Sequence, residues 1–160
     1  MEKLEGSQEF EGFASDEVVF YVPVPEDVVG LDAFDAGEQE ILDVLNRKVA
    51  SGDSLDSVMD FLYETSHGVW PCDRIGLAFV EDDGRRVTSR WVRAEYEPVI
   101  MGSGYTEDLE GSTLKPLIDG KVLRVITDME EYGRRNPASR STKVLLREGV
   151  RSSMTCPLVV

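Results

Sequence analysis

The hydrophobic pattern of the first fifty residues changes from that of a strand to that of a helix. Residues 18–22 are β-branched or aromatic and Pro23 follows them, which predicts one short strand at the edge of a sheet, because proline cannot donate to a ladder. From Glu38 onward, apolar residues recur at helical spacing until Gly52. The spacing predicts a helix over 38–51 with one apolar stripe and an otherwise solvated surface.

A second helix and a β-hairpin are predicted next. Ser54 is placed to cap the helix, and Pro71 ends it. An apolar strand over 74–80 then leads into a turn over 82–84, where Asp-Gly is a strong hairpin signal. The return strand over 86–96 alternates between two faces. One of these faces carries Val87, Ser89, Trp91, Arg93 and Glu95.

Polar and glycine-rich stretches divide the remainder into shorter elements. A loop over 102–111 precedes a short helix that Ser112 caps and Gly120 ends, and a strand follows over 122–126. The last elements are a polar helix or loop over 129–137, an amphipathic helix over 139–148 with Gly149 at its C-cap, and a strand over 152–160. This order predicts an α+β fold, with a mixed or antiparallel sheet and helices packed on its faces.

Composition limits the kind of protein without choosing a function. The chain has 160 residues, with 17 Lys and Arg against 31 Asp and Glu, a net charge of −14, and its length favours one domain. The first 60 residues hold 16 acidic and 3 basic side chains. We therefore interpret 1–37 as an acidic leader with a short strand near 18–22, and 38–160 as the folded domain. So acidic a chain disfavours nucleic acid as a partner.

The sequence carries no targeting signal that we can identify. No apolar run approaches the ~20 residues that a membrane span needs, and the acidic start lacks the apolar segment of a signal peptide. Cys72 and Cys156 are the two cysteines, and no Cys-x-x-Cys occurs, so both are expected to be buried, reduced thiols. The expected location is cytoplasmic, without a membrane span.

Several polar groups could carry chemistry, but each has a plainer interpretation, and no enzyme is predicted. His67 has no nucleophile beside it in sequence and is interpreted as a helix-end residue. The glycine-rich segment 102–104 lacks the lysine of a P-loop. Acidic side chains of the turns lack calcium-loop spacing, so no metal is predicted at Asp82, Asp83, Glu107, Asp108 and Glu110. A nucleic-acid surface and a strand face paired with the domain's acids both fit the basic run Arg85, Arg86, Arg90 and Arg93.

Three parts of the chain resemble, in order and spacing, parts of a GAF domain. Residues 72–84 resemble its first hairpin, 109–114 with 125–128 resemble its central helix and the strand after it, and 146–158 resemble its penultimate strand. The last of these contains the family's Gly-x-Arg-Ser … Pro-Leu pattern. The resemblance covers 38–160 and implies a GAF-like α/β sandwich, in which helices pack on the faces of a central antiparallel sheet.

The chain departs from the family in one respect. Domains of this family continue after the Pro157-Leu158 pair with about two more β-elements, whereas this chain stops at Val160. The GAF-like domain is therefore expected to be C-terminally incomplete. The strand near 18–22 has no counterpart in the family, and we expect it to pair with the open sheet edge, because an exposed edge is costly.

The resemblance implies a small-molecule-sensing regulatory domain of a bacterial signal-transduction protein. In the family, a ligand lies between the sheet and the short helices that cover it. Neither the pattern of cyclic-nucleotide-binding members nor the cysteine–histidine pair of bilin-binding members is found, so the ligand stays unidentified and no cofactor is assigned. By position, the ligand-binding residues would be Phe79, Trp91, Tyr105, Leu109, Ser112, Thr113, Leu117, Ile126, Asp128, Leu145 and Thr155.

The resemblance also implies a homodimer that passes ligand state to an output domain of the full-length protein. Helices that flank such domains pair with their copies, and ligand binding would shift their relative position. The dimer stripe would consist of Ile41, Leu42, Leu45 and Val49. Two alternatives stay open: a ligand-free dimerisation module whose pocket its own side chains fill, and a thiol-dependent reductase that uses Cys72 and Cys156.

Overall fold

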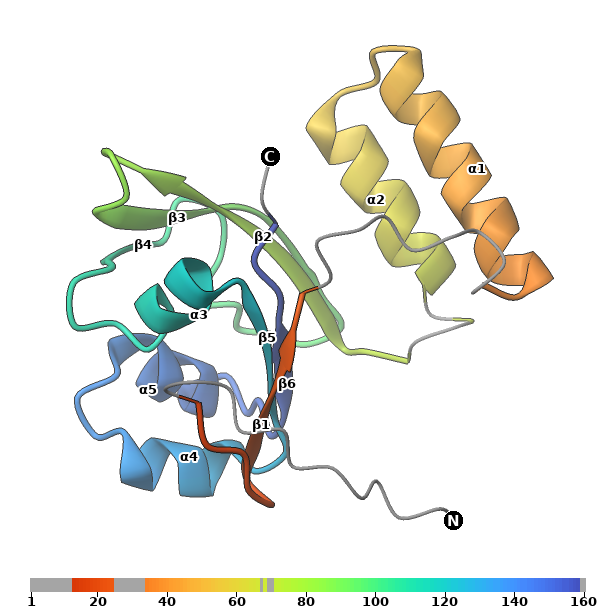
Figure 1. The fold of residues 1–160 in the computed structure, drawn as a ribbon. Coiled ribbons are helices and arrows are strands. Elements are labelled where there is room, and N and C mark those ends of the chain that lie inside the picture. Colours follow the sequence, from red (N-terminus) through yellow and green to blue (C-terminus); the bar gives the residue numbers. More distant parts are fainter. Residues whose placement is uncertain (1–12, 25–33, 67, 69–70, 159–160) are drawn as a thin grey trace. The chain divides into compact units, whose positions relative to one another are not determined.

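The computed structural model describes residues 13–24, 34–66, 68 and 71–158. The chain divides into two compact units: a terminal unit, 1–24 with 108–160, and a central unit, 25–107. Both units contain helices and strands, so the fold is of the predicted mixed α+β class (Figure 1). The described strands pair in two three-stranded sheets, one for each unit, and the prediction of a single central sheet is not confirmed.

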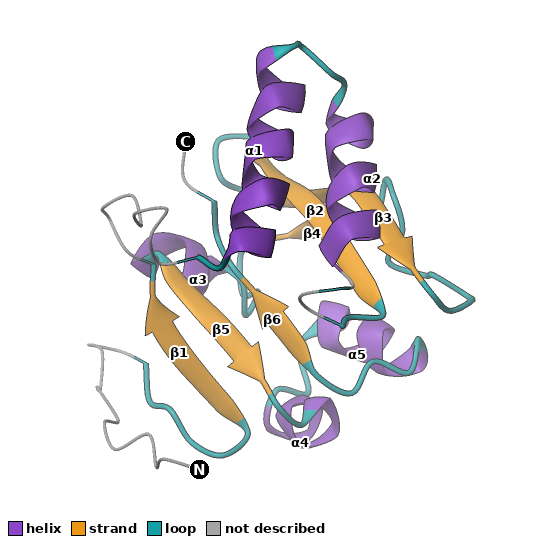
Figure 2. Cartoon of the chain, turned by 90° about the vertical axis from the view of Figure 1, so that its right-hand side faces the viewer, coloured by secondary structure: helices purple, strands orange, loops and turns teal. Residues whose placement is uncertain are grey.

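Two helices begin the described part of the central unit. α1 (Ala36–Ala50) starts two residues earlier than predicted, at a capping box in which Asp35 and Glu38 each accept the other's backbone N–H at 2.9 Å. α2 (Leu55–Ser66) follows Ser54, whose Oγ caps the first turn at 3.2 Å as predicted. The two helices lie side by side in both ribbon views (Figures 1 and 2).

The sheet of the central unit is a hairpin with one short strand added. β2 (Arg74–Glu81) pairs antiparallel with β3 (Arg86–Ala94), as predicted, and Gly84 has a φ of 83° in the turn between them. β4 (Thr106–Asp108) joins β3 on its other side. The sequence predicted only a loop there, because three polar residues carry no strand pattern of their own.

A bulge interrupts the predicted alternation of β3. The register shifts between Leu77 and Ala78 of β2, so Arg90 of β3 stands opposite neither of them. Thr88 and Ser89 are both buried although they are adjacent, which a strict period of two does not allow. The assignment of alternate residues of 86–96 to two faces is therefore wrong across this point.

Helix α2 packs on β3 through aromatic and charged side chains. The Tyr63 and Trp91 rings meet edge to face, with 6.3 Å between their centroids. Asp60 accepts hydrogen bonds from Trp91 Nε1 at 3.3 Å and from Arg93 Nη1 at 3.0 Å. Trp91 is thereby buried with its N–H satisfied, and it anchors the helix to the hairpin within this unit.

The sheet of the terminal unit has the strand order β1-β5-β6. β1 (Val19–Pro23) pairs antiparallel with the whole of β5 (Val122–Ile126), and β6 (Ser153–Thr155) pairs antiparallel with the other side of β5. Figure 2 shows these three strands side by side. The segment predicted as a strand near 18–22 thus lies at a sheet edge.

Three short helices accompany this sheet: α3 (Lys115–Gly120), α4 (Met129–Arg135) and α5 (Arg140–Arg147). Asp128 caps α4 by accepting the N–H of its third residue at 2.9 Å, and Ser139 caps α5 in the same way at 3.4 Å. The predicted amphipathic helix over 139–148 and its C-terminal glycine are both present, since Gly149 has a φ of 88°.

Both ends of α3 differ from the prediction. Ser112 accepts a hydrogen bond from the N–H of Leu114 at 3.1 Å before the helix begins, so it is not the N-cap. At the other end, Lys121 takes the left-handed conformation, with a φ of 49°, in the terminating role predicted for Gly120. Gly120 is favoured for a different reason, because an added Cβ would lie 2.9 Å from the Phe13 ring, which would have to shift.

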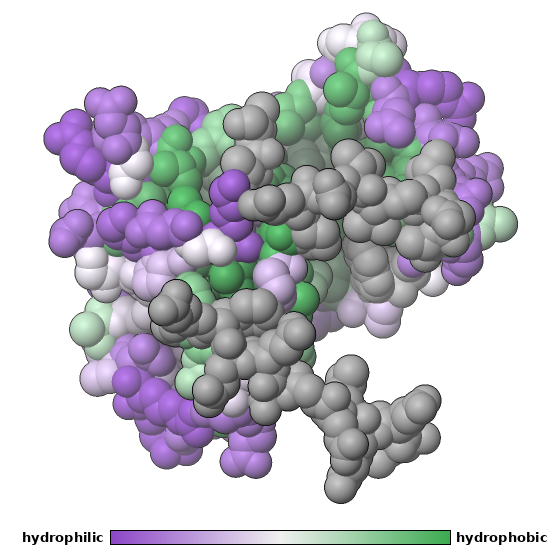
Figure 3. All heavy atoms as spheres, in the orientation of Figure 1, coloured by the Kyte–Doolittle hydropathy of each residue, from purple (hydrophilic) through white to green (hydrophobic). Residues whose placement is uncertain are grey.

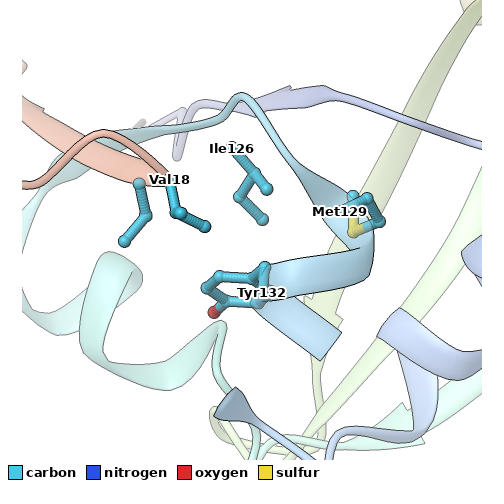
Figure 4. Packing of buried hydrophobic residues seen from close by; sticks show 5 residues of the cluster. Val18, Ile126, Met129 and Tyr132 are labelled. Atoms are coloured by element: carbon cyan, nitrogen blue, oxygen red, sulfur yellow. The ribbon is translucent and has the colours of Figure 1, made fainter. Parts of the chain in front are cut away.

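The core of the terminal unit lies between β1, β5 and α4. Its buried cluster consists of Val18, Val19, Ile126, Met129 and Tyr132. Figure 4 shows Val18 and Ile126 beside the Tyr132 ring. Each large apolar side chain in such a cluster contributes ~1.5–3 kcal/mol when it is fully buried. Half-buried side chains that pack against the cluster are Tyr21, Leu145, Leu146 and Val150.

Hydrophilic residues gather over the β2–β3 turn and over α4 (Figure 3). Arginines of the basic run form ion pairs with carboxylates of the same unit: Arg86 with Asp82, Arg90 with Glu81, and Arg93 with Asp60 and Glu64. This favours a strand face paired with acids over a nucleic-acid surface. No helix in the described ranges combines the length and the apolar character needed to cross a membrane.

Asp16 ties the start of β1 to α4 and gives the fold a dependence on acid pH. Its carboxylate accepts the N–H groups of Val19 at 3.0 Å and Val18 at 2.7 Å, and it pairs with Arg135 at 2.6 Å. These bonds, in that order, lower the pKa of Asp16. A pKa lowered on folding adds stability above the unfolded value of about 3.9, and that stability is lost as the pH falls through the folded value.

We expect Asp16→Asn to flatten the acid part of the profile of unfolding free energy against pH, below about pH 4. Urea denaturation at a series of pH values measures the profile. Glu17→Gln is the matched control, because it removes the neighbouring exposed carboxylate. Equal flattening by both variants would contradict the specific role of Asp16.

Candidate functional site

The predicted ligand-binding residues fall in both units. Within the central unit, Phe79 of β2 is 42% exposed, and Trp91 is buried against α2. Tyr105 is half-buried, and its hydroxyl donates to Glu107 at 3.3 Å. The remaining predicted residues belong to the terminal unit: Leu109, Ser112, Thr113, Leu117, Ile126, Asp128, Leu145 and Thr155.

Most of these terminal-unit residues have a structural role. Leu109, Leu117 and Ile126 are among the most deeply buried side chains of the described chain. Asp128 caps α4, and Leu145 packs on the core cluster. Three of the predicted residues, Thr113, Ile126 and Thr155, are brought together around a side chain that the sequence analysis did not select.

That side chain is Arg124, at the centre of β5. Burial alternates along β5, so Arg124 lies on the same inward face as Val122 and Ile126, and it is only 6% exposed. In the sequence, Arg124 is flanked by apolar residues on both sides, so the pattern indicates a strand but does not say which face carries the arginine. Its inward direction comes from the fold, and a charge buried there needs an explanation.

The hydrogen bonds of Arg124 leave part of its guanidinium unsatisfied. Nη1 donates to the Thr113 carbonyl at 3.2 Å and to the Tyr132 hydroxyl at 2.8 Å, and the guanidinium carbon lies 5.2 Å from the centre of the Tyr132 ring. Nε is buried and has no hydrogen-bond partner. No carboxylate of the residues that the structure describes pairs with this arginine.

Two hydroxyl side chains flank Arg124 across the sheet. Tyr21 of β1 and Thr155 of β6 are its partners in register, and cross-strand partners lie on the same face. Burial raises the pKa of the Tyr21 hydroxyl, Tyr132 adds to this effect, and the positive charge of Arg124 opposes it. One buried cation thus donates to a hydroxyl of α4 and has hydroxyl-bearing residues of β1 and β6 as its cross-strand neighbours.

The energetics of this arrangement favour an anion. Removing a charged group from water costs several kcal/mol, and hydrogen bonds to neutral oxygens and a cation–π contact return only part of that cost. Buried arginines in proteins are therefore ordinarily paired with an acidic group. A negatively charged hydrogen-bond acceptor at Nε would supply the pairing that this buried guanidinium lacks.

A hollow beside α4 is less suited to a specific ligand than the surroundings of Arg124. It has a volume of about 420 Å³ and is lined by Glu17, Val18, Asp128, Glu131, Arg134 and Arg135. Its charges already neutralise one another, since Glu131 pairs with both Arg134 and Arg135. It is open to solvent, and solvent-exposed ion pairs of this kind contribute little binding energy.

The two thiols do not match their prediction. Cys156 is exposed just after the edge strand β6, and Cys72 is half-buried, so the expectation of two buried thiols is wrong. Among the described residues, no three His, Cys, Asp or Glu side chains come close enough together to hold a metal ion. His67 lies outside the described residues.

Comparisons with known proteins provide no relative from which an activity could be transferred. No family model matches the chain, and neither the curated proteins nor the solved structures contain a match to it. Function is therefore inferred from the residues of this chain.

Proposed function

We propose that this chain is a small-molecule-sensing regulatory domain of the GAF type within a signal-transduction protein. The observation that carries the proposal is Arg124, a buried cation with an unmet donor. It contacts Thr113, stands opposite Thr155 and shares its face with Ile126, all assigned to the ligand by the resemblance. A charged group that is so costly to bury is best explained by a ligand that binds to it. The proposal assigns no reaction to the chain.

Signal transmission is proposed to run through α1 in a homodimer. Its apolar stripe is incompletely covered: Ile41, Leu42 and Leu45 are half-buried, and Val49 is 63% exposed. A ligand that binds one arrangement of the paired helices better than another shifts the population toward it. An output domain of the full-length protein would respond to that shift.

The first test compares the native mass of the purified full chain with its denatured mass. We expect a dimer carrying extra mass from a small molecule. The alternative function, a ligand-free dimerisation module, is favoured by the complete burial of Leu109, Leu117 and Ile126, which would fill the pocket themselves. A bare dimer that no metabolite stabilises against heat would overturn the sensing function in favour of this module.

We expect Val49→Asp to convert the dimer to a monomer, because it places a charge in the proposed apolar contact. Sedimentation velocity over a range of concentrations measures the change. Ala50→Asp is the matched control, because it adds the same charge one position away, also exposed and also near the C-terminal end of α1. A dimer that persists in Val49→Asp would remove α1 from the interface.

A further inference from the structure

The unused donors of Arg124 lie along one edge of its guanidinium. The group has five N–H bonds in a fixed plane. The two on Nη1 go to the Thr113 carbonyl and the Tyr132 hydroxyl, and the N–H on Nε has no partner. The described hydrogen bonds of Arg124 all come from Nη1, so the edge formed by Nε and Nη2 is the part left to bind a ligand.

We propose that this edge binds the carboxylate of a small organic effector, an inference that rests on the proposed sensing function and names its ligand class. Nε and Nη2 present two parallel N–H bonds, the spacing that a carboxylate matches with its two oxygens. Tyr21 and Thr155 stand on either side of Arg124 in register, and their hydroxyls can complete the coordination of the same oxygens. Ile126 and Val122 lie on the same face and are buried in the ligand-free protein, so the body of the effector contacts them only once the packing on this face changes.

Charge balance selects a carboxylate over a phosphate group. One guanidinium neutralises one negative charge, which a carboxylate supplies. A phosphate monoester carries a charge of about −1.5 to −2 and would leave an uncompensated charge in a buried site. In the described part of the chain, the groups that contact Arg124 are a carbonyl oxygen and the hydroxyl and ring of a tyrosine, none of them a second cation.

Burial of Nε makes binding dependent on a rearrangement. A carboxylate reaches this nitrogen only after a covering side chain moves, because the atom is shielded from solvent in the ligand-free protein. The states with and without the effector therefore differ in packing on this face of β5. Such a difference is what a sensor needs, since a ligand shifts only an equilibrium between states that it distinguishes.

The test is a titration of the full chain with sodium acetate and sodium butyrate at constant ionic strength. The Nε–Hε signals of the arginines are followed by ¹⁵N NMR, and Arg124→Lys assigns the signal of interest by its loss. We expect a saturable shift of the Arg124 signal, tighter for butyrate than for acetate. The Arg85 signal is the internal control, because its Nε already donates to the Asp82 carbonyl at 2.9 Å. It should not respond.

A second readout does not depend on the arginine signal. Butyrate should raise the melting temperature of the wild-type chain, and Arg124→Lys, which keeps the charge but loses the paired donors, should weaken this response at least tenfold in concentration. Arg124→Met serves the same purpose if the lysine variant does not fold. An equal response of the wild type and the variants would overturn the inference.

The remaining outcomes separate this inference from the function on which it rests. If inorganic phosphate shifts the Arg124 signal and the carboxylates do not, the ligand class is wrong. The ligand class is also wrong if the native mass reveals a neutral ligand that Arg124→Met still binds. In that case the proposed sensing function stands. If no anion moves the signal and the native chain carries no extra mass, both proposals fall.

Discussion

Ile126→Ala is expected to lower the free energy of unfolding by about 2–5 kcal/mol. The side chain is only 1% exposed and is packed among Val18, Val19, Met129 and Tyr132, from β1, the turn before it and α4. Truncation removes buried methyl groups and leaves a cavity that a rigid sheet cannot close. Urea denaturation followed by circular dichroism measures the loss, with the ligand-free protein as the reference.

Phe79→Ala is the matched comparison, because the resemblance assigned Phe79 to the same ligand contact. Phe79 is 42% exposed, so much of its ring is already in water. Its truncation should cost clearly less than that of Ile126 although more atoms are removed. A loss below about 1 kcal/mol for Ile126→Ala would mean that its surroundings collapse freely, as expected for a residue that lines an open pocket and not a core.

The elements set by local chemistry were predictable from the sequence. Ser54 caps α2, and Gly84 and Gly149 take the positive φ angles of a hairpin turn and a helix end. β5 also has the predicted bounds, because four apolar and mostly β-branched residues around Arg124 favour a strand. In each case the deciding signal lies within a few residues of the feature itself.

The elements set by distant partners were not predictable in this way. β4 exists because its backbone pairs with β3, and its three residues show no strand pattern. The bulge at Arg90 depends on the register with β2, and the place of Gly120 depends on Phe13, far away in sequence. Pairing and close approach across the fold are properties of two segments, and neither segment carries the information alone.

The candidate site likewise has some features that the sequence could predict and others that depend on distant segments. The resemblance supplied Thr113, Ile126 and Thr155, whereas the inward direction of Arg124 follows only from the burial of β5 in the fold. The missing partner of its Nε could not be foreseen, because it depends on what β1, β6 and α4 place around it. The most informative feature of the site is thus a buried donor without a hydrogen-bond partner, which can be recognised only in the folded structure.

Replacing this arginine should therefore stabilise the ligand-free protein. We expect Arg124→Met to raise the free energy of unfolding by about 1–3 kcal/mol, since an apolar side chain of similar length removes the desolvation cost of an unpaired buried charge. Two hydrogen bonds and one cation–π contact are lost, which offsets part of the gain. By contrast, removing one member of a complete buried ion pair lowers the free energy of unfolding, by ~3–5 kcal/mol.

The sign of this change distinguishes a binding residue from a structural one. Tyr132→Phe is the control, because it removes the hydroxyl that accepts from Nη1 while the buried ring and the charge remain, and it should destabilise the protein. Urea denaturation of both variants, with and without butyrate, gives the comparison. At a butyrate concentration ten times its dissociation constant, binding should raise the free energy of unfolding of the wild type by about 1.4 kcal/mol. It should leave that of Arg124→Met unchanged. A variant that is less stable than the wild type without ligand would show that Arg124 serves the fold, because natural binding groups are retained at a cost in stability.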